Sequence, residues 1–272
     1  IKAKPIIDIA VAVEDFGAIT VLMPVLEREG WLKSVLHAVE NDHLLLVAGD
    51  KVTETRTHHI HFVLDGSTKW KNYLRFRDYL NANPDAAKAY EAVKIELADR
   101  FPNDRSAYTD GKETVINEIL RKAQVWSLLG KSVTVTIDRP IGAAQPDDSE
   151  IVYPLNYGHI AGEIAPDGEE LTAYVLGVDN PAAAFNGKVI AIIHREDDVE
   201  DKLVVAEAAV FPEEDIAQAV RFQEQYCRNH IELWHGERGL TDLPAYPTFA
   251  KIEPLNKGWS NDKKFYTETA DG

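Results

Sequence analysis

The chemistry that this sequence can support is concentrated in two acidic clusters in its second half. The first cluster lies within Pro166–Gly177 (PDGEELTAYVLG). An Asp167-Gly168 turn there places Glu169 and Glu170 directly before an apolar run, which is typical of a loop that leads into a β-strand. Hard divalent cations require oxygen ligands of this kind.

The second cluster lies within His194–Val205 (HREDDVEDKLVV), where five of the six residues from Glu196 to Asp201 are acidic and Lys202 follows. Mg²⁺ binds through one or two carboxylates together with the phosphate oxygens of a substrate. The two clusters therefore predict a site for Mg²⁺ and a phosphate compound at the ends of β-strands. The alternative is that both clusters are solvated hairpin loops of an acidic protein.

A third group of candidate ligands lies near the N-terminus. Residues 56–64 (RTHHIHFVL) indicate a strand, and alternation along it places His59 and His61 on the same face. Residues 3–13 (AKPIIDIAVAV) are typical of a buried strand, and Asp8 is embedded in it. Because imidazole suits borderline metals, these three side chains are a candidate site for one metal ion or for phosphate. The alternative is a histidine pair that is packed on the strand or bonded to water.

The composition limits the classes of function. The chain has 272 residues, enough for two domains, and its net charge of −16 argues against nucleic acid and membrane surfaces as partners. The single cysteine, Cys227, excludes an internal disulfide and is typical of a cytoplasmic protein. No apolar run approaches the roughly 20 residues that cross a bilayer, and no signal peptide is visible. Because the chain starts at Ile1 and its only methionine is Met23, we expect both ends to be cut from a longer protein.

The first half of the chain is predicted to be an α+β unit in which strands precede a run of helices. Gly30, Pro84 and Pro102 are stop signals for three of the helices, and an Asp110-Gly111 pair weakens the fourth. The expected elements are strands at 3–13, 43–49 and 56–64, a helix at 15–31, and three consecutive helices from Ser67 to before Pro84, at 85–101 and at 106–126.

The second half is predicted to be a small closed β-barrel that ends in a helix. Residues 132–138 alternate strictly between apolar side chains on one face and polar side chains on the other. Gly, Pro, Asn and Asp separate the further short strands, which favours a barrel. We expect these strands at 151–153, 172–178, 188–194 and 202–206, and the helix at 213–229.

The order of the pieces in residues 1–126 resembles the GrpB family. The matching segments include KPIIDIAV, RTHHIHFV and EILRKAQ, with the helical stretch between the last two. The resemblance implies a nucleotidyltransferase-like α+β domain of undefined activity. In that superfold a strand carries two alternating carboxylates after a Gly-Ser helix start. Here Asp8 is followed two residues later by Ala10, and the Gly-Ser segment would lie before Ile1. We therefore expect no nucleotide transfer by this part of the chain.

Residues 131–231 resemble the family I inorganic pyrophosphatases in their short form. The resemblance is carried by five motifs in the family's order: IDRPIG, YPLNYGHI, DGEELTAYVLG, GKVIAIIHREDDVEDKLVV and FQEQY. It implies an OB-like barrel that hydrolyses pyrophosphate with Mg²⁺, using cationic and hydroxyl donors to hold the phosphoryl oxygens. By this resemblance the metal ligands are Asp167, Asp197 and Asp201, the residue that orients or deprotonates the attacking water is Glu169, and the phosphate contacts are Arg139, Tyr157, Tyr226 and Lys202.

Several positions depart from the family's pattern. Thr172 stands where the family has a metal-binding carboxylate, and a neutral hydroxyl is a far poorer ligand. Glu169 replaces an aspartate, and Cys227 replaces a lysine. Lys202 directly follows Asp201, where the long form of the family has one intervening residue, so the register there is open. The structural alternatives are core aromatics with solvated hydroxyls for the two tyrosines, and a barrel-rim ion pair for Arg139.

The C-terminal segment has a different character. Pro244 and Pro247 mark a linker, and Ile252–Gly272 resembles the first hairpin of an aminoglycoside phosphotransferase-like kinase. No phosphate-binding lysine or catalytic aspartate of that fold follows, so we assign this segment no activity. The predicted parts are a GrpB-like domain at 1–128, a pyrophosphatase-like domain at 131–235, and a linker with the kinase-like hairpin at 236–272.

The function predicted from these motifs is Mg²⁺-dependent hydrolysis of pyrophosphate or a related phosphoanhydride by the barrel. The alternative is a non-catalytic module that binds Mg²⁺ and phosphate. The sequence leaves the oligomeric state open.

Overall fold

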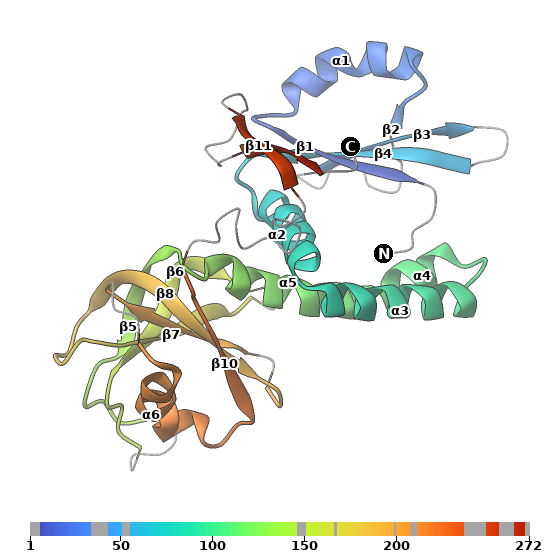
Figure 1. Ribbon diagram of the computed structural model, residues 1–272. Helices are drawn as coiled ribbons and strands as arrows, with labels where there is room; N and C mark the ends of the chain where they lie inside the picture. Colours follow the sequence, from blue (N-terminus) through green and yellow to red (C-terminus); the bar gives the residue numbers. More distant parts are fainter. Residues whose placement is uncertain are drawn as a thin grey trace. The chain divides into compact units, whose positions relative to one another are not determined.

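The computed structural model describes residues 6–33, 43–50, 55–145, 151–165, 168–198, 200–207 and 211–236, and the backbone of 249–255 and 264–269. The chain forms two compact units, Ile1–Glu232 and Leu233–Gly272. In the first unit an open sheet and a group of helices precede a five-stranded closed β-barrel (Figure 1). The predicted α+β class with a barrel in the later region is confirmed. Within the described ranges, no helix is both long and apolar enough to cross a membrane.

The N-terminal sheet has the strand order β1-β4-β3-β2, in which β1 runs parallel to β4. The strands are β1 (Ile7–Val13), β2 (Leu32–Lys33), β3 (His43–Asp50) and β4 (Thr55–Leu64). Helix α1 (Gly17–Arg28) covers one face (Figure 1), where Ile19 packs against Leu46 and Phe62. Because side chains alternate along a strand, residues 59 and 61 of β4 lie on the opposite face from Phe62. His59 and His61 therefore lie on the face of the sheet away from α1.

Four helices follow this sheet: α2 (Thr68–Ala82), α3 (Pro84–Arg100), α4 (Arg105–Gly111) and α5 (Glu113–Leu128). The predicted start at Ser67 is confirmed, because its hydroxyl accepts a hydrogen bond of 3.2 Å from the backbone N–H of Trp70. The single helix predicted over 106–126 is wrong, since α4 and α5 are separated at Lys112. Gly111 approaches α3 so closely that a Cβ there would lie 2.6 Å from Leu97. This close approach explains why a glycine interrupts the helix.

Five strands close the barrel in the order β8-β5-β6-β7-β9, with β9 pairing back to β8. They are β5 (Ser132–Arg139), β6 (Asn156–Ile164), β7 (Glu170–Val175), β8 (Ala184–Arg195) and β9 (Lys202–Ala206), and β10 (Asn229–Leu233) extends the sheet beyond β8. The barrel interior is filled by fully buried apolar side chains, including Val135, Val175 and Leu203. Val125 and Leu128 of α5 belong to the same cluster. The helix thus contributes directly to the barrel core.

Strand β6 is the longest of the strands that the sequence did not predict. The strand predicted at 151–153 is wrong, since Val152 forms only an isolated bridge with Ala144. β6 contains Gly158 and Gly162, and glycine weakens a strand prediction. The glycine at 158 is required by packing, because a Cβ there would lie 1.8 Å from the carbonyl oxygen of Thr136 on β5.

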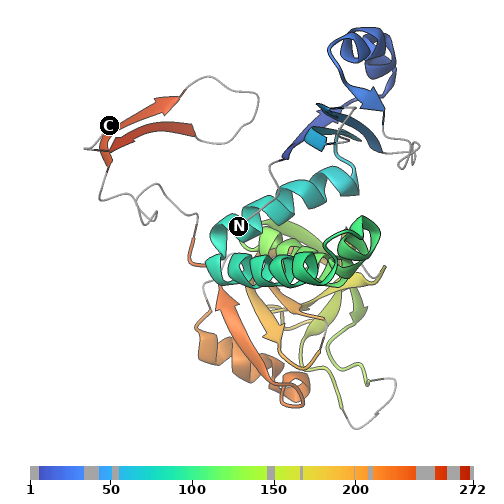
Figure 2. The same ribbon diagram turned by 90° about the vertical axis from the view of Figure 1, so that its right-hand side faces the viewer.

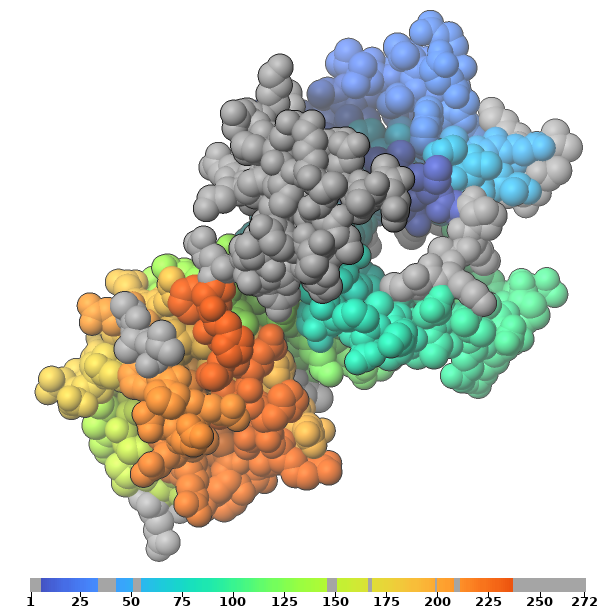
Figure 3. Space-filling model, in the orientation of Figure 1, coloured from blue at the N-terminus to red at the C-terminus, as the bar shows by residue number. Residues whose placement is uncertain are grey.

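The helix expected at 213–229 is also shorter than predicted. Helix α6 spans Glu213–Glu224, and the side-chain amide of Asn229 donates to the carbonyl oxygen of Glu224 at 2.9 Å. This bond satisfies a terminal carbonyl group of the helix, and β10 begins at the same asparagine. The orange segments α6 and β10 lie on the outside of the barrel (Figure 2), and residues of this colour form a continuous part of the surface (Figure 3).

The second unit contains an antiparallel hairpin of β11 (Phe249–Leu255) and β12 (Lys264–Thr269). The hairpin expected near the C-terminus is therefore present, whereas the loop between its strands lies outside the described residues. The predicted domain boundaries at 128, 131 and 235 stay predictions.

An ion pair joins α2 to the barrel strand β6. Arg75 donates to both carboxylate oxygens of Glu163, at 2.9 and 3.1 Å, and its Nε donates to Ser127 at 3.1 Å. Gln124 of α5 also donates to Glu163, at 2.9 Å. The side chains of Arg75 and Glu163 are only 12% and 18% exposed. A charge left without its partner at this position would therefore be poorly solvated.

We predict that Glu163→Ala lowers the free energy of unfolding by about 3 kcal/mol, because it leaves the guanidinium of Arg75 buried and unpaired. The double variant Arg75→Met/Glu163→Leu should lower the free energy of unfolding by less, since it leaves no buried charge. Asp85→Ala is the matched control: it breaks the exposed pair with Lys88, and we expect a change within about 0.5 kcal/mol. Urea unfolding of the four proteins measures these differences. Equal losses for Glu163→Ala and Asp85→Ala would show that the buried pair has no special role.

Candidate functional site

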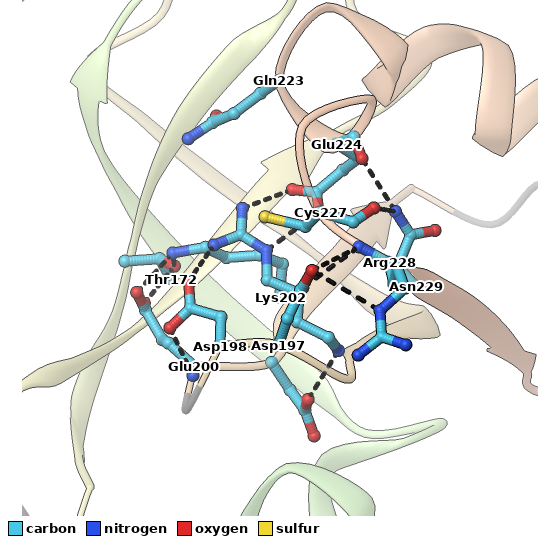
Figure 4. A network of polar contacts seen from close by, with 12 residues as sticks. Thr172, Asp197, Asp198, Glu200, Lys202, Gln223, Glu224, Cys227, Arg228 and Asn229 are labelled. Carbon is cyan, nitrogen blue, oxygen red and sulfur yellow. Dashed lines mark hydrogen bonds and ion pairs between the residues drawn. The ribbon is translucent and has the colours of Figure 1, made fainter.

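The ammonium group of Lys202 is the centre of a polar cluster on the barrel, and Figure 4 shows Lys202 together with Thr172 and Glu200 of this cluster. Its Nζ donates to Glu200 at 2.6 Å, to the hydroxyl of Thr172 at 2.8 Å and to the hydroxyl of Tyr157 at 3.1 Å. Thr172 in turn donates to Glu200 at 2.8 Å. The Lys202 side chain is only 4% exposed. Three strand regions, β6, β7 and the start of β9, therefore converge on one buried cation.

Strand register explains why these side chains meet. Tyr157 is directly opposite Tyr174 on β7, and Tyr174 is level with Val204 on β9. Since every second side chain shares a face, Thr172 and Lys202 lie on the same face as these three residues. The intervening residues of β7 and β9 fill the barrel interior. The cluster therefore occupies the outer face of the barrel.

Asp201, which is predicted to be a metal ligand, does not belong to this cluster, and its role as a ligand stays a prediction. One of its oxygens is 2.9 Å from Nδ1 of His194, and the other accepts a hydrogen bond of 3.1 Å from the backbone N–H of Arg195. The physical reason is alternation, which turns Asp201 to the face opposite Lys202. Glu200, two residues before Lys202, takes the place beside the ammonium group. The same alternation, applied to the sequence, could have identified Glu200.

The other expected residues of the barrel site have different surroundings. Arg139 is opposite Tyr157 in the β5–β6 register and donates to the carbonyl oxygen of Asp138 at 2.9 Å. Tyr226 follows α6 and is 69% exposed. The carboxylate of Asp197 accepts from the backbone N–H of Arg228 at 3.0 and 3.2 Å. Glu169 is exposed just before β7, and Asp167 lies outside the described residues. The structure thus brings Tyr157 and Lys202 together, with Arg139 on the adjacent strand.

A second network, which the sequence analysis did not identify, fixes the acidic loop to α6. Arg195 donates to both oxygens of Glu224, at 2.6 and 2.9 Å, and to Asp198 at 2.9 Å. The hydroxyl of Tyr174 donates to Glu224 at 2.5 Å. Burial and the adjacent Glu224 raise the pKa of Tyr174, which keeps it protonated as a donor. Burial alone would lower the pKa of Arg195, but Glu224 outweighs burial and raises it.

The N-terminal candidates Asp8, His59 and His61 also meet, as the sequence predicts. One ligand atom from each lies within 4.8 Å of the other two. Nδ1 of His59 is 2.9 Å from Asp8 Oδ1, and Nε2 of His61 is 3.7 Å from the same oxygen. The imidazole of His61 outweighs burial and, together with that of His59, lowers the pKa of Asp8. Burial lowers the pKa of His59, whose Nε2 is buried without a hydrogen-bond partner.

His194 bridges two carboxylates on the side of the barrel away from Lys202. Its Nδ1 is 2.9 Å from Asp201 and its Nε2 is 3.0 Å from Glu232, and its ring stacks on that of His230 at 4.9 Å. Burial alone would lower the pKa of His194, but the two carboxylates outweigh it and raise the pKa to about 9. The ring lines a cavity of about 500 Å³ that α2 lines through Tyr79 and α5 lines through Glu118, Arg121 and Lys122.

Comparison with known proteins gives the following similarities. A family model described as "GrpB protein" matches residues 1–122. The chain is 36% identical over 123 residues to the glutamate-rich protein GrpB of Alkalihalophilus pseudofirmus. The aligned region covers 45% of this chain and 71% of that protein. The crystal structure of conserved protein GrpB from Enterococcus faecalis has 32% identity, with a TM-score of 0.40, over 44% of this chain and 70% of that one. An inorganic pyrophosphatase from Neisseria gonorrhoeae has 23% identity, with a TM-score of 0.29, over 36% of this chain and 74% of that one. The kinase-like resemblance of residues 252–272 finds no support in these comparisons.

We predict that the raised pKa of His194 makes stability depend on pH. A histidine with a pKa of about 9 in the folded state and 6.5 in the unfolded state stabilises the fold fully below about pH 6.5. This contribution, at most about 3 kcal/mol, is lost as the pH rises through 9. Thermal unfolding between pH 6 and 10 measures it, and His194→Gln should flatten the profile. The exposed His230 serves as the control, because His230→Gln should leave the slope nearly unchanged. A wild-type profile no steeper than that of His194→Gln would contradict the assignment.

Proposed function

The chain belongs to the GrpB family through its N-terminal region. We propose that the barrel that follows this region acts on a phosphate compound. The proposed reaction is Mg²⁺-dependent hydrolysis of pyrophosphate or a related phosphoanhydride. The observation that carries this proposal is the convergence of Tyr157, Thr172 and Glu200 on the buried Lys202. This cluster combines a cation, two hydroxyl groups and a carboxylate on adjacent strands.

The cluster has the groups that phosphoryl transfer uses. Positioning and electrostatic stabilisation carry most of the catalysis in such reactions, because charge is spread over the phosphoryl oxygens. Lys202 provides a fixed positive charge, and Arg139 lies on the neighbouring strand, opposite Tyr157. All three N–H groups of Lys202 have partners within the cluster, so a substrate oxygen must replace one of them. The bond to Tyr157, at 3.1 Å, is the longest of the three.

In the proposed reaction the oxygen of a water molecule forms a bond to one phosphorus atom. The bridging P–O bond then breaks, and the second phosphate leaves with its electron pair. Glu169 accepts the proton of the water molecule, as the family resemblance implies, and its exposed position before β7 makes it accessible to solvent. Lys202 and Arg139 hold the phosphoryl oxygens as negative charge develops on the leaving phosphate.

The oxygen donors of the cluster fit Mg²⁺ through a carboxylate, but the hydroxyl of Thr172 is a poorer ligand. Glu200 offers carboxylate oxygens, and Mg²⁺ is held by one or two carboxylates together with substrate phosphates and water. Thr172 offers only a hydroxyl, which already bridges Glu200 and Lys202. When bound, Mg²⁺ would neutralise the substrate and lower the pKa of the attacking water.

A specific observation favours a second function, a module that binds Mg²⁺ and phosphate without turnover. Lys202 is neutralised by Glu200 at 2.6 Å, and the neighbouring Thr172 cannot bridge two metal ions as a carboxylate can. Phosphate release from Mg²⁺-pyrophosphate by the purified 272-residue chain separates the two functions. Release above background that requires Mg²⁺ supports hydrolysis. Background release, with pyrophosphate binding still visible by calorimetry, supports the binding module, and the absence of both contradicts each.

If the barrel hydrolyses pyrophosphate, Glu169→Gln should lower kcat by about 100-fold or more, because it removes the proton acceptor. Metal affinity should change little, since Glu169 is proposed as the proton acceptor and not as a metal ligand. Glu213→Gln in the first turn of α6 is the matched control, because it removes an exposed carboxylate elsewhere on the same barrel. Steady-state phosphate release measures both variants. An increase in kcat for Glu169→Gln would show that the role implied by the resemblance is wrong.

Thr172→Asp should raise the rate by about tenfold, because it places a second carboxylate beside Glu200 and within reach of Lys202. The Mg²⁺ concentration needed for half-maximal activity should fall at the same time. Ser132→Asp on the exposed start of β5 adds the same charge away from the cluster and should leave both quantities unchanged. Indifference to Thr172→Asp would mean that the outer face of the barrel is not a metal centre.

A further inference from the structure

We propose that Asp8, His59 and His61 bind one divalent transition-metal ion of borderline softness, with Zn²⁺ as the representative ion. This site lies on the N-terminal sheet and goes beyond the phosphate chemistry proposed for the barrel. Its ligands are two imidazole nitrogens and one carboxylate oxygen, a set that Zn²⁺, Co²⁺ and Fe²⁺ accept and that Mg²⁺ does not prefer.

The backbone pairing of two strands creates the site. β1 and β4 are parallel, and their register places Asp8 directly opposite His59. His61 lies two residues further along β4, on the same face, and its partner on β1 is Ala10. Because Ala10 has only a methyl group, no large side chain stands between the His61 ring and Asp8. Two rigid strands thus hold all three ligands.

The two distances from the Asp8 carboxylate to the histidine ligand atoms match a small coordination sphere, and the two histidine atoms lie within 4.8 Å of each other. Tetrahedral zinc with bonds of about 2.0–2.1 Å requires ligand atoms about 3.3 Å apart. Asp8 Oδ1 lies 2.9 Å from His59 Nδ1 and 3.7 Å from His61 Nε2. Each distance is therefore within about 0.4 Å of the requirement. Side-chain rotation alone can supply shifts of this size.

Neighbouring groups support His61 on the side of its ring that faces away from Asp8. Its Nδ1 lies 3.0 Å from Nε2 of His43 on β3 and 3.3 Å from the hydroxyl of Tyr73 on α2. A histidine that binds a metal through Nε2 carries its proton on Nδ1, and His43 Nε2 is positioned to accept that proton. Metal-binding histidines are commonly oriented by a second hydrogen bond of this kind. The rings of His43 and His61 also stack, with centroids 5.2 Å apart.

The site has a buried side and an open side. His59 is 9% exposed, whereas the Asp8 side chain is 65% exposed. Three protein ligands leave at least one position of a tetrahedral ion for water or another ligand, as in catalytic rather than structural zinc sites. The carboxylate edge is where an ion and an exchangeable ligand would enter. The negative charge of Asp8 favours a cation.

The test uses the complete 272-residue chain after removal of metal by a chelator. Titration with Zn²⁺ in a calorimeter should show one ion bound per chain, and Co²⁺ should give a visible absorption band of low coordination number. Asp8→Asn and His61→Gln should each weaken Zn²⁺ binding by about 100-fold or more, and His43→Gln by about 10- to 100-fold. His58→Gln is the matched control. His58 lies on the same strand but points to the opposite face, near Trp31, and its substitution should leave affinity unchanged.

Three results would overturn the proposal: no saturable uptake by the wild type, uptake unchanged in the double variant Asp8→Asn/His61→Gln, or displacement of Zn²⁺ by a modest excess of Mg²⁺. The second result would assign the ion to other groups, such as His194 and His230. Should a variant unfold, imidazole ¹⁵N spectra of the wild type decide the question. Zn²⁺ must shift the signals of His59 and His61 and leave that of His58 in place, and any other pattern contradicts the site.

Discussion

The burial of one ammonium group sets the constraint on which the outer face of the barrel depends. Lys202 is almost completely removed from solvent, so each of its three N–H groups needs an acceptor. The acceptors come from β6, from β7 and from the residue two positions before Lys202 itself. A shift of one residue in β6 or β7 would turn an acceptor away from Lys202 and leave one of its N–H groups buried without a partner. The same bonds that fix the site therefore also neutralise it, so a phosphate ligand has to compete with the protein's own groups.

The separation of polar and apolar chemistry in the barrel follows from strand alternation. Side chains such as Ala173, Leu203 and Val205 fill an interior that contacts no solvent, so charged groups collect on the outer face. Helix α6 covers part of that face through a pair in which Arg195 donates twice to Glu224. Since a bidentate pair fixes both distance and orientation, it holds the helix and the acidic loop in one arrangement. The surroundings of Lys202 thus depend on an ion pair formed by residues from two other elements.

Local signals in the sequence were sufficient for much of the fold and insufficient for part of the site. The cap at Ser67, the stop before Pro84 and the alternation in residues 132–138 act within a few residues, and each predicted the correct element. Strand β6 was missed because Gly158 is required by the close approach of β5, which is a tertiary contact with no local signature. The motifs predicted Asp201 as a metal ligand and Lys202 as a phosphate contact, but they did not indicate that Glu200 contacts Lys202. Asp8, His59 and His61 were grouped correctly, since alternation alone places both histidines on one face.

The two candidate metal sites differ in what holds their ligands in place: backbone pairing in one and side-chain hydrogen bonds in the other. In the N-terminal sheet, backbone pairing between β1 and β4 places the ligands, which include two nitrogen donors. In the barrel, a network of side-chain bonds places oxygen donors around a cation. The two donor sets therefore favour different ions, and neither set needs residues of the other. What they share is helix α5, whose Val125 packs in the barrel core and whose Gln124 bonds the same Glu163 that pairs with Arg75 of α2. Because α2 also supplies Tyr73, which contacts His61, a continuous series of packed and hydrogen-bonded groups extends from the histidine cluster to the barrel core.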